Sequence, residues 1–196
     1  MTQRWGERRW TATLLARLRG LFGVRQREIP EQLPNLPARL RRGELATSYL
    51  SAERDGDHRR AAAAAVTSAD RAIVEREWWA ADAWAHRALW HFERAEMTLQ
   101  ATRAARRIGE LRTAAGDPSS ARRYYAEAIS EARDIGAERE EGLAALGLGR
   151  AELDLGNVTT ARQLAQIAID LLERCGAPAD EVEAARQLRG EEKEVG

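Results

Sequence analysis

The chain has 196 residues, of which 31 are Lys or Arg and 31 are Asp or Glu, so its formal net charge at neutral pH is zero. This balance argues against a nucleic-acid-binding role for the chain as a whole. The single cysteine, Cys175, excludes an internal disulfide and fits a reducing compartment. The sequence contains no run of 18 or more apolar residues, so it predicts no transmembrane helix.

Residues 1–27 predict a basic amphipathic helix, the N-terminal arm. They contain seven Arg and one Glu, a net charge of +6, and their apolar residues form one stripe when placed on a helix. Such a helix can pack on its own domain, dock on another protein or lie on an anionic membrane surface, and the sequence leaves these three roles open. The candidate docking residues of the arm are Trp5, Trp10, Leu14, Leu18, Leu21 and Phe22.

Residues 28–38 contain three of the five prolines and predict an extended linker, because proline at this density prevents a regular helix. A repeat domain is expected to follow at residues 39–190. Its first helix is predicted over 39–55, and the charged residues 191–196 predict a disordered tail.

An internal repeat organises the domain. Residues 108–129 (IGELRTAAGDPSSARRYYAEAI) align without a gap with residues 148–169 (LGRAELDLGNVTTARQLAQIAI), 40 positions later. Three helix pairs are expected on this period, at about 57–95, 97–135 and 137–175. A final polar helix at about 179–190 would cap the stack.

Glycine followed by Asp or Asn marks the turn inside the second and third pairs. Gly116 and Gly156 can end the first helix in a left-handed conformation, and Asp117 and Asn157 can cap the second helix. In the pair 57–95 the equivalent turn has diverged to Arg-Glu. Small residues recur seven positions apart on one face of the second helix, where they allow close helix contact. They are Ala121, Ala128, Ala161 and Ala168.

These residues resemble the tetratricopeptide repeat (TPR) family. The matching positions are Ile108-Gly109, Gly116-Asp117, Ala121, Tyr125 and Ala128, and, one period later, Leu148-Gly149, Gly156-Asn157, Ala161 and Ala168. The period of 40 is longer than the period of about 34 residues that is usual for the family. The resemblance implies an all-α fold, a right-handed superhelical solenoid of antiparallel helix pairs.

The resemblance also implies a groove lined by the first helix of each pair. The candidate partner-binding residues are Asp70, Arg103, Arg106, Glu110 and Arg150. Apolar positions beside them are Val66, Ile73, Leu146 and Leu153. Arginines among apolar residues suit a peptide that carries carboxylates. The alternative is that these are ordinary solvated charges on a helix face.

No catalytic motif is present. His86 and His91 lie five residues apart without the further ligands that a metal site needs, so packed or solvated histidines are expected. Trp84 occupies a core position, whereas one of Trp78 and Trp79, which replace the turn, could be an exposed interface anchor. The sequence therefore predicts no enzyme activity, no cofactor and no metal.

The resemblance implies a scaffold or adaptor that binds a peptide or partner protein, in the cytoplasm. Two alternatives depend on the arm: a membrane-peripheral assembly factor, and RNA binding through the arm's arginines and tryptophans. The sequence leaves the partner and the oligomeric state open.

Overall fold

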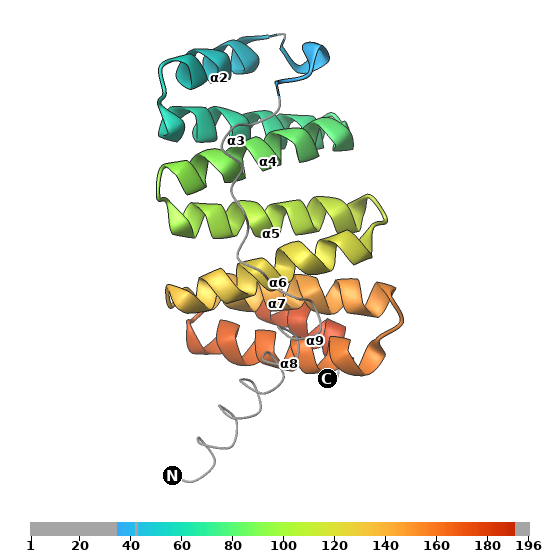
Figure 1. Cartoon of the computed structure of the whole chain (residues 1–196). Helices are drawn as coiled ribbons and strands as arrows, with labels where there is room; N and C mark the ends of the chain where they lie inside the picture. The colour runs from blue at the N-terminus through green and yellow to red at the C-terminus, as the bar shows by residue number, and fades with distance from the viewer. Residues whose placement is uncertain (1–34, 42, 191–196) are drawn as a thin grey trace.

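The computed structural model describes residues 35–41 and 43–190, and these residues form helices and turns with no strand. Each helix packs against the next to make a single stack (Figure 1). The elements are η1 (Ala38–Leu40, a 3-10 helix), α2 (Glu44–Arg54), α3 (His58–Val74), α4 (Trp78–Arg94), α5 (Thr98–Ala114), α6 (Pro118–Asp134), α7 (Glu138–Asp154), α8 (Val158–Arg174) and α9 (Ala179–Arg189). The three predicted helix pairs are confirmed as α3–α4, α5–α6 and α7–α8.

The backbone repeats at half the period of the sequence. Helices α3 to α8 are each 17 residues long. Connections of equal length join each of them to the next. After each helix from α2 to α8 one residue has a positive φ, at positions 56, 76, 96, 116, 136, 156 and 176. At Gly116 the backbone N–H bonds to Thr113 O, and the Asp117 N–H bonds to Arg112 O, which is the Schellman pattern.

The divergent turn at Arg76-Glu77 has the same geometry as the glycine turns. Arg76 N–H bonds to Ile73 O and Glu77 N–H bonds to Ala72 O, at 3.0 and 2.8 Å. Arg76 therefore adopts a φ of 58°, and Glu96 adopts 56° at the next turn.

Of the two predicted helix N-caps, Asp117 is confirmed at the start of α6 and Asn157 is not confirmed at the start of α8. The Asp117 side chain accepts a hydrogen bond from Ser120 N at 3.0 Å. Asn157 makes no such bond; its amide nitrogen donates instead to Glu152 Oε2 at 2.7 Å. The prediction that Asn157 caps α8 was therefore wrong, because the Glu152 carboxylate competes for the same side chain.

Small residues allow the helices to approach closely. Ala121 and Ala128 of α6 are fully buried, as are their equivalents in α8. Helix α5 packs against α7 as well as α6, and α7 packs against α9 as well as α8, whereas α3 and α5 make no comparable contact. We call the surface formed by α3, α5, α7 and α9 the odd-helix face.

The N-terminal end of the domain differs from the predicted single helix over 39–55. Gly43, with a φ of 92°, separates η1 from α2. Leu36 and Leu40 are 5% and 8% exposed and belong to the core, so the chain packs against the stack before residue 39. The arm, the first part of the linker and the tail lie outside the described residues.

Tyr49 attaches α2 to the stack. Its buried ring lies edge-on against Trp84 and His91 of α4, with centroids 5.1 and 5.4 Å away. Its hydroxyl lies 2.9 Å from Glu53 Oε1 and 3.0 Å from His91 Nε2. Because a carboxylate only accepts hydrogen bonds, Tyr49 donates to Glu53, and His91 Nε2–H donates to Tyr49.

This arrangement fixes the tautomer of His91. With its proton on Nε2, His91 Nδ1 accepts a hydrogen bond from His58 Nδ1–H at 2.9 Å. Burial is the main reason that the pKa of His91 falls to about 4, and the neighbouring His58 and Arg87 lower it further. Neutral His91 thus connects α2, α3 and α4.

No helix among the described residues is long and apolar enough to cross a membrane.

Candidate functional site

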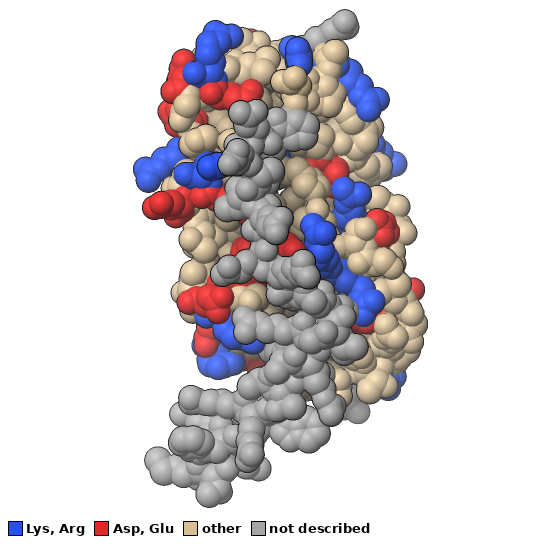
Figure 2. Space-filling view, in the orientation of Figure 1, with Lys and Arg blue, Asp and Glu red and all other residues tan. Residues whose placement is uncertain are grey.

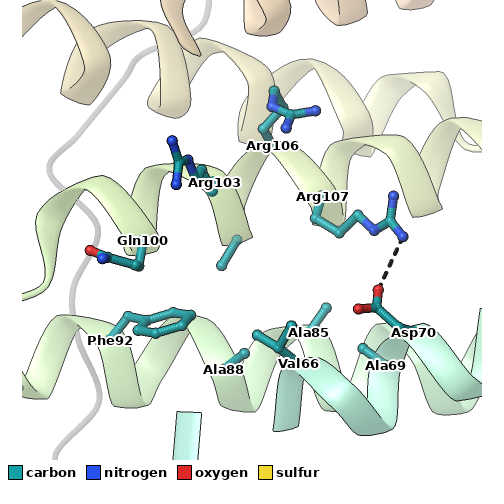
Figure 3. A pocket seen from close by; sticks show the side chains of 11 residues that line it. Val66, Ala69, Asp70, Ala85, Ala88, Phe92, Gln100, Arg103, Arg106 and Arg107 are labelled. Atoms are coloured by element: carbon teal, nitrogen blue, oxygen red, sulfur yellow. Dashed lines mark hydrogen bonds and ion pairs between the residues drawn. The ribbon is translucent and has the colours of Figure 1, made fainter. Parts of the chain in front are cut away.

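A hollow of about 310 Å³ opens where α3 and α5 lie over α4. Figure 3 shows its side chains converging from these three helices. It lies where α3 and α5 lack the close contact that joins α5 to α7. Its lining residues are Val66, Ala69, Asp70, Ala85, Ala88, Phe92, Gln100, Arg103, Ala104, Arg106 and Arg107.

The bottom of the hollow is apolar and is formed by small residues. Ala85 and Ala88 come from α4, Ala69 comes from α3 and Ala104 comes from α5, and all four are buried. Methyl groups at these positions leave space that longer side chains would fill. An apolar hollow edged by a few polar groups is a common form of binding site.

Arg107 closes one end of the hollow by joining α5 to α3. Its guanidinium lies 3.2 Å from Asp70 Oδ1, as drawn in Figure 3, and 3.1 Å from Glu110 Oε2. All three side chains are more than a third exposed, so each of these pairs adds at most about 1 kcal/mol to stability.

Glu140 of α7 holds the other two arginines of the rim. Its side chain is 6% exposed and lies 2.7 Å from Arg103 Nε and 3.4 Å from Arg106 Nε. Arg106 also pairs with Glu110. A buried carboxylate requires such partners. Arg103 and Arg106 therefore stabilise the junction of α5 and α7 as well as bordering the hollow.

The positively and negatively charged side chains around the hollow are equal in number. Three arginines at 103, 106 and 107 face three carboxylates at 70, 110 and 140. Figure 2 likewise shows basic and acidic side chains interspersed over one face of the stack. The positive and negative charges at the rim of the hollow therefore largely cancel.

The structure brings together most of the residues predicted for the groove. Asp70, Arg103 and Arg106 line the hollow, and Glu110 is joined to them by ion pairs. Arg150 lies apart: it is exposed on α7 and forms no ion pair with another described residue. Of the apolar positions predicted beside them, Val66 lines the hollow, whereas the other three lie outside it. These are Ile73, Leu146 and Leu153.

Three features of the hollow were not predicted from the sequence: Arg107, Glu140 and the alanines at its bottom. Glu140 is 37 residues from Arg103, so spacing along one helix gives no sign of their contact. The 40-residue alignment did contain a sign of the hollow, because Ala85 occupies the position that Tyr125 occupies one period later. The exchange of a large residue for a small one at equivalent positions indicates a space.

The other predicted residues are placed as follows. Trp84 is buried in the core, as predicted. Trp78 and Trp79 are 41% and 40% exposed at the start of α4, and the guanidinium of Arg39 lies 3.4 Å from the centroid of the Trp79 ring. Their role as interface anchors stays a prediction. The docking residues predicted for the arm lie outside the described residues. They are Trp5, Trp10, Leu14, Leu18, Leu21 and Phe22.

His, Cys, Asp and Glu side chains form no group of three that could hold a metal ion anywhere in residues 35–41 and 43–190.

No model of a known protein family matches this chain, and no curated protein matches it.

Proposed function

We propose that this protein is an interaction scaffold that binds a segment of a partner protein on its odd-helix face. The observation that carries the proposal is the hollow between α3 and α5, which combines an apolar bottom with exposed charged groups at its rim. This combination suits a peptide that inserts one apolar side chain and forms polar contacts beside it.

The resemblance to TPR proteins supports the same role. In this proposal the stack is a right-handed superhelix of TPR-like pairs, and the odd-numbered helices line its inner groove. The packing of α5 on α7 and of α7 on α9 is consistent with an inner face on that side. The proposal assigns the groove a binding role and no catalytic step.

The membrane-peripheral and RNA-binding alternatives depend on residues 1–27, which lie outside the described residues. No contact of the described residues favours either one, so binding through the odd-helix face is the function proposed.

Arginine-to-alanine substitutions would not test this proposal cleanly. Removing Arg103 and Arg106 would leave Glu140 buried without its partners, and the domain would lose stability as well as any partner contact. Substitution of an exposed apolar residue avoids this problem.

Val66→Arg is the direct test, and Val158→Arg is its matched control. Val66 borders the hollow and is 37% exposed, whereas Val158 begins α8 and is 43% exposed. Partners would be recovered with the intact chain from its source cells and quantified by mass spectrometry. We expect Val66→Arg to weaken at least one association by about tenfold or more, because a charge at an apolar contact is costly, and Val158→Arg to leave it unchanged.

Equal recovery with wild type and both variants, at equal thermal stability, would place the interaction elsewhere. Loss with Val158→Arg alone would point to the α7–α8 edge instead.

A further inference from the structure

The 40-residue period relates three positions on the odd-helix face. Ala69 of α3, Gly109 of α5 and Gly149 of α7 are equivalent by this period. Ala69 lines the hollow between α3 and α5, and a Cβ at Gly109 or Gly149 would meet the side chain that lies between its own helix and the next odd helix. What occupies that space differs from one repeat to the next.

We number the pairs α3–α4, α5–α6 and α7–α8 as the first, second and third repeats. In the second repeat, the ring of Tyr125 fills the space. Tyr125 extends from α6 between α5 and α7 and is 3% exposed. A Cβ atom at Gly109 would lie 2.9 Å from its Cε1, and a Cβ at Gly147 of α7 would also collide with the ring. Two glycines therefore make room for one aromatic side chain.

In the third repeat, a leucine fills the space. A Cβ at Gly149 would lie 2.7 Å from Cδ2 of Leu188, which belongs to α9. The residue equivalent to Tyr125 here is Ala165, which is fully buried. The capping helix thus supplies the side chain that α8 lacks.

In the first repeat, the corresponding side chain is absent. Ala85 stands where Tyr125 stands one repeat later, and both Ala85 and Ala69 line the hollow. Ala69 and Arg107 stand where Gly109 and Gly147 border the Tyr125 ring, so room for a ring here comes from the missing close contact between α3 and α5 rather than from glycines. We propose that this hollow accepts an aromatic side chain from a partner peptide, beside Ala85. The inference rests on the proposed function and specifies what the odd-helix face recognises.

The rim indicates what flanks that aromatic residue. Arg103 is half exposed, and among the described residues only its Nε is engaged, by Glu140. Its terminal NH₂ groups remain available to an acceptor beside the hollow, and a carboxylate is the strongest acceptor for a guanidinium. A peptide with an acidic residue next to the aromatic residue is therefore the complementary partner.

The test uses p-cresol, which is the side chain of tyrosine, with the full chain carrying ¹³C-labelled alanine methyl groups. We expect p-cresol to shift the NMR signals of Ala69, Ala85, Ala88 and Ala104 and to leave the buried Ala161 unaffected. The non-aromatic analogue 4-methylcyclohexanol should bind several-fold more weakly, because it lacks the flat shape and ring quadrupole of an aromatic group.

Two variants change the number of sites in opposite directions. Ala85→Tyr supplies the missing ring from within, so p-cresol affinity should fall by about tenfold or more. Tyr125→Ala opens the equivalent space in the second repeat, so that variant should bind a second p-cresol molecule next to Gly109. If one variant fails to fold, the wild-type titration and the other variant still test whether the hollow binds an aromatic group.

Three results would overturn the proposal. In the first, p-cresol shifts none of the hollow's methyl signals up to its solubility limit. In the second, 4-methylcyclohexanol binds equally well. In the third, replacing Trp5, Trp10 and Phe22 by alanine tightens p-cresol binding, which would identify the chain's own N-terminal segment as the occupant.

Failure of this inference differs from failure of the proposed function. If partner recovery still depends on Val66 while p-cresol does not bind, the scaffold role stands and the aromatic specificity is wrong. If p-cresol binds and no partner association responds to Val66→Arg, the scaffold role is wrong.

Discussion

Two residues, Arg76 and Glu96, adopt a backbone conformation that glycine adopts at the five equivalent turns. Their φ angles are 58° and 56°, against 66–81° for Gly56, Gly116, Gly136, Gly156 and Gly176. In this region a side chain brings Cβ too close to the backbone carbonyl. Both turns nevertheless keep their Schellman hydrogen bonds, so the packing of the helices imposes the geometry.

Arg76→Gly and Glu96→Gly should therefore each raise the free energy of unfolding by about 0.5–1 kcal/mol, since removal of the Cβ strain outweighs the extra freedom of glycine in the unfolded chain. Chemical denaturation of the intact chain measures this. Gly116→Ala is the control: its Cβ would meet no atom within 4 Å, so its expected loss of about 1 kcal/mol is conformational alone. A loss of stability in both glycine variants would show that the arginine and glutamate side chains contribute more than the strain they cause.

At this scale the sequence predicted the turns that glycine marks, and it placed the equivalent turn at Arg76-Glu77 without predicting that this turn keeps the same geometry. Arg76 looks like a lost turn because local residue preference favours glycine, whereas the structure keeps the turn through tertiary packing. Asn157 shows the reverse: its residue type suits a cap, but Glu152 engages its side chain.

Among the elements, α2 is held to the stack by a chain of hydrogen bonds that is buried at Tyr49 and His91. His91 of α4 connects Tyr49 and Glu53 of α2 with His58 of α3. Arg87, which is also in α4, lowers the pKa of His91. The chain requires neutral His91, because the Nδ1 that accepts from His58 cannot also carry a proton.

The attachment of α2 should therefore weaken in mild acid. The pKa of His91 is about 4 in the folded protein and 6.5 when unperturbed, so between these values the unfolded state binds the extra proton. The free energy of unfolding should fall as pH decreases from 6.5 to 4, by at most about 3 kcal/mol from this group. Thermal melts across this range measure the slope.

His91→Phe separates this effect from the protonation of carboxylates. Phenylalanine keeps a ring between Tyr49 and Trp90 and does not titrate. The variant should be less stable than wild type at pH 7, and the difference should shrink toward pH 4. A difference that stays constant with pH would exclude His91 as the titrating group.

On the scale of the whole molecule, the sequence predicted the helix pairs and only part of the candidate site. The match between residues 108–129 and 148–169 predicted the spacing of the pairs, because turns and small contact residues recur in register. The shorter repeat of the backbone, at half that spacing, was not predicted, since first and second helices differ in sequence although they have equal length.

The ion pairs of the site depend on information that a period does not carry. The ion pairs of Glu140 join residues from different helices, and their partners are set by how α5 and α7 pack. The hollow depends on a missing side chain at Ala85, which becomes apparent only when the neighbouring repeats show what fills the same space. A list of favourable residues along one helix cannot show an absence of this kind.

Site-specific photo-crosslinking tests most directly whether the odd-helix face binds a partner. A photoreactive residue in place of Gln100, at the hollow, is compared in the intact chain with the same residue in place of Gln163, which is exposed on α8. Binding by the odd-helix face predicts that position 100 forms a cross-link to a defined segment of another protein, and that position 163 does not. Cross-links from position 100 only to this chain itself, or the same products from both positions, would contradict it.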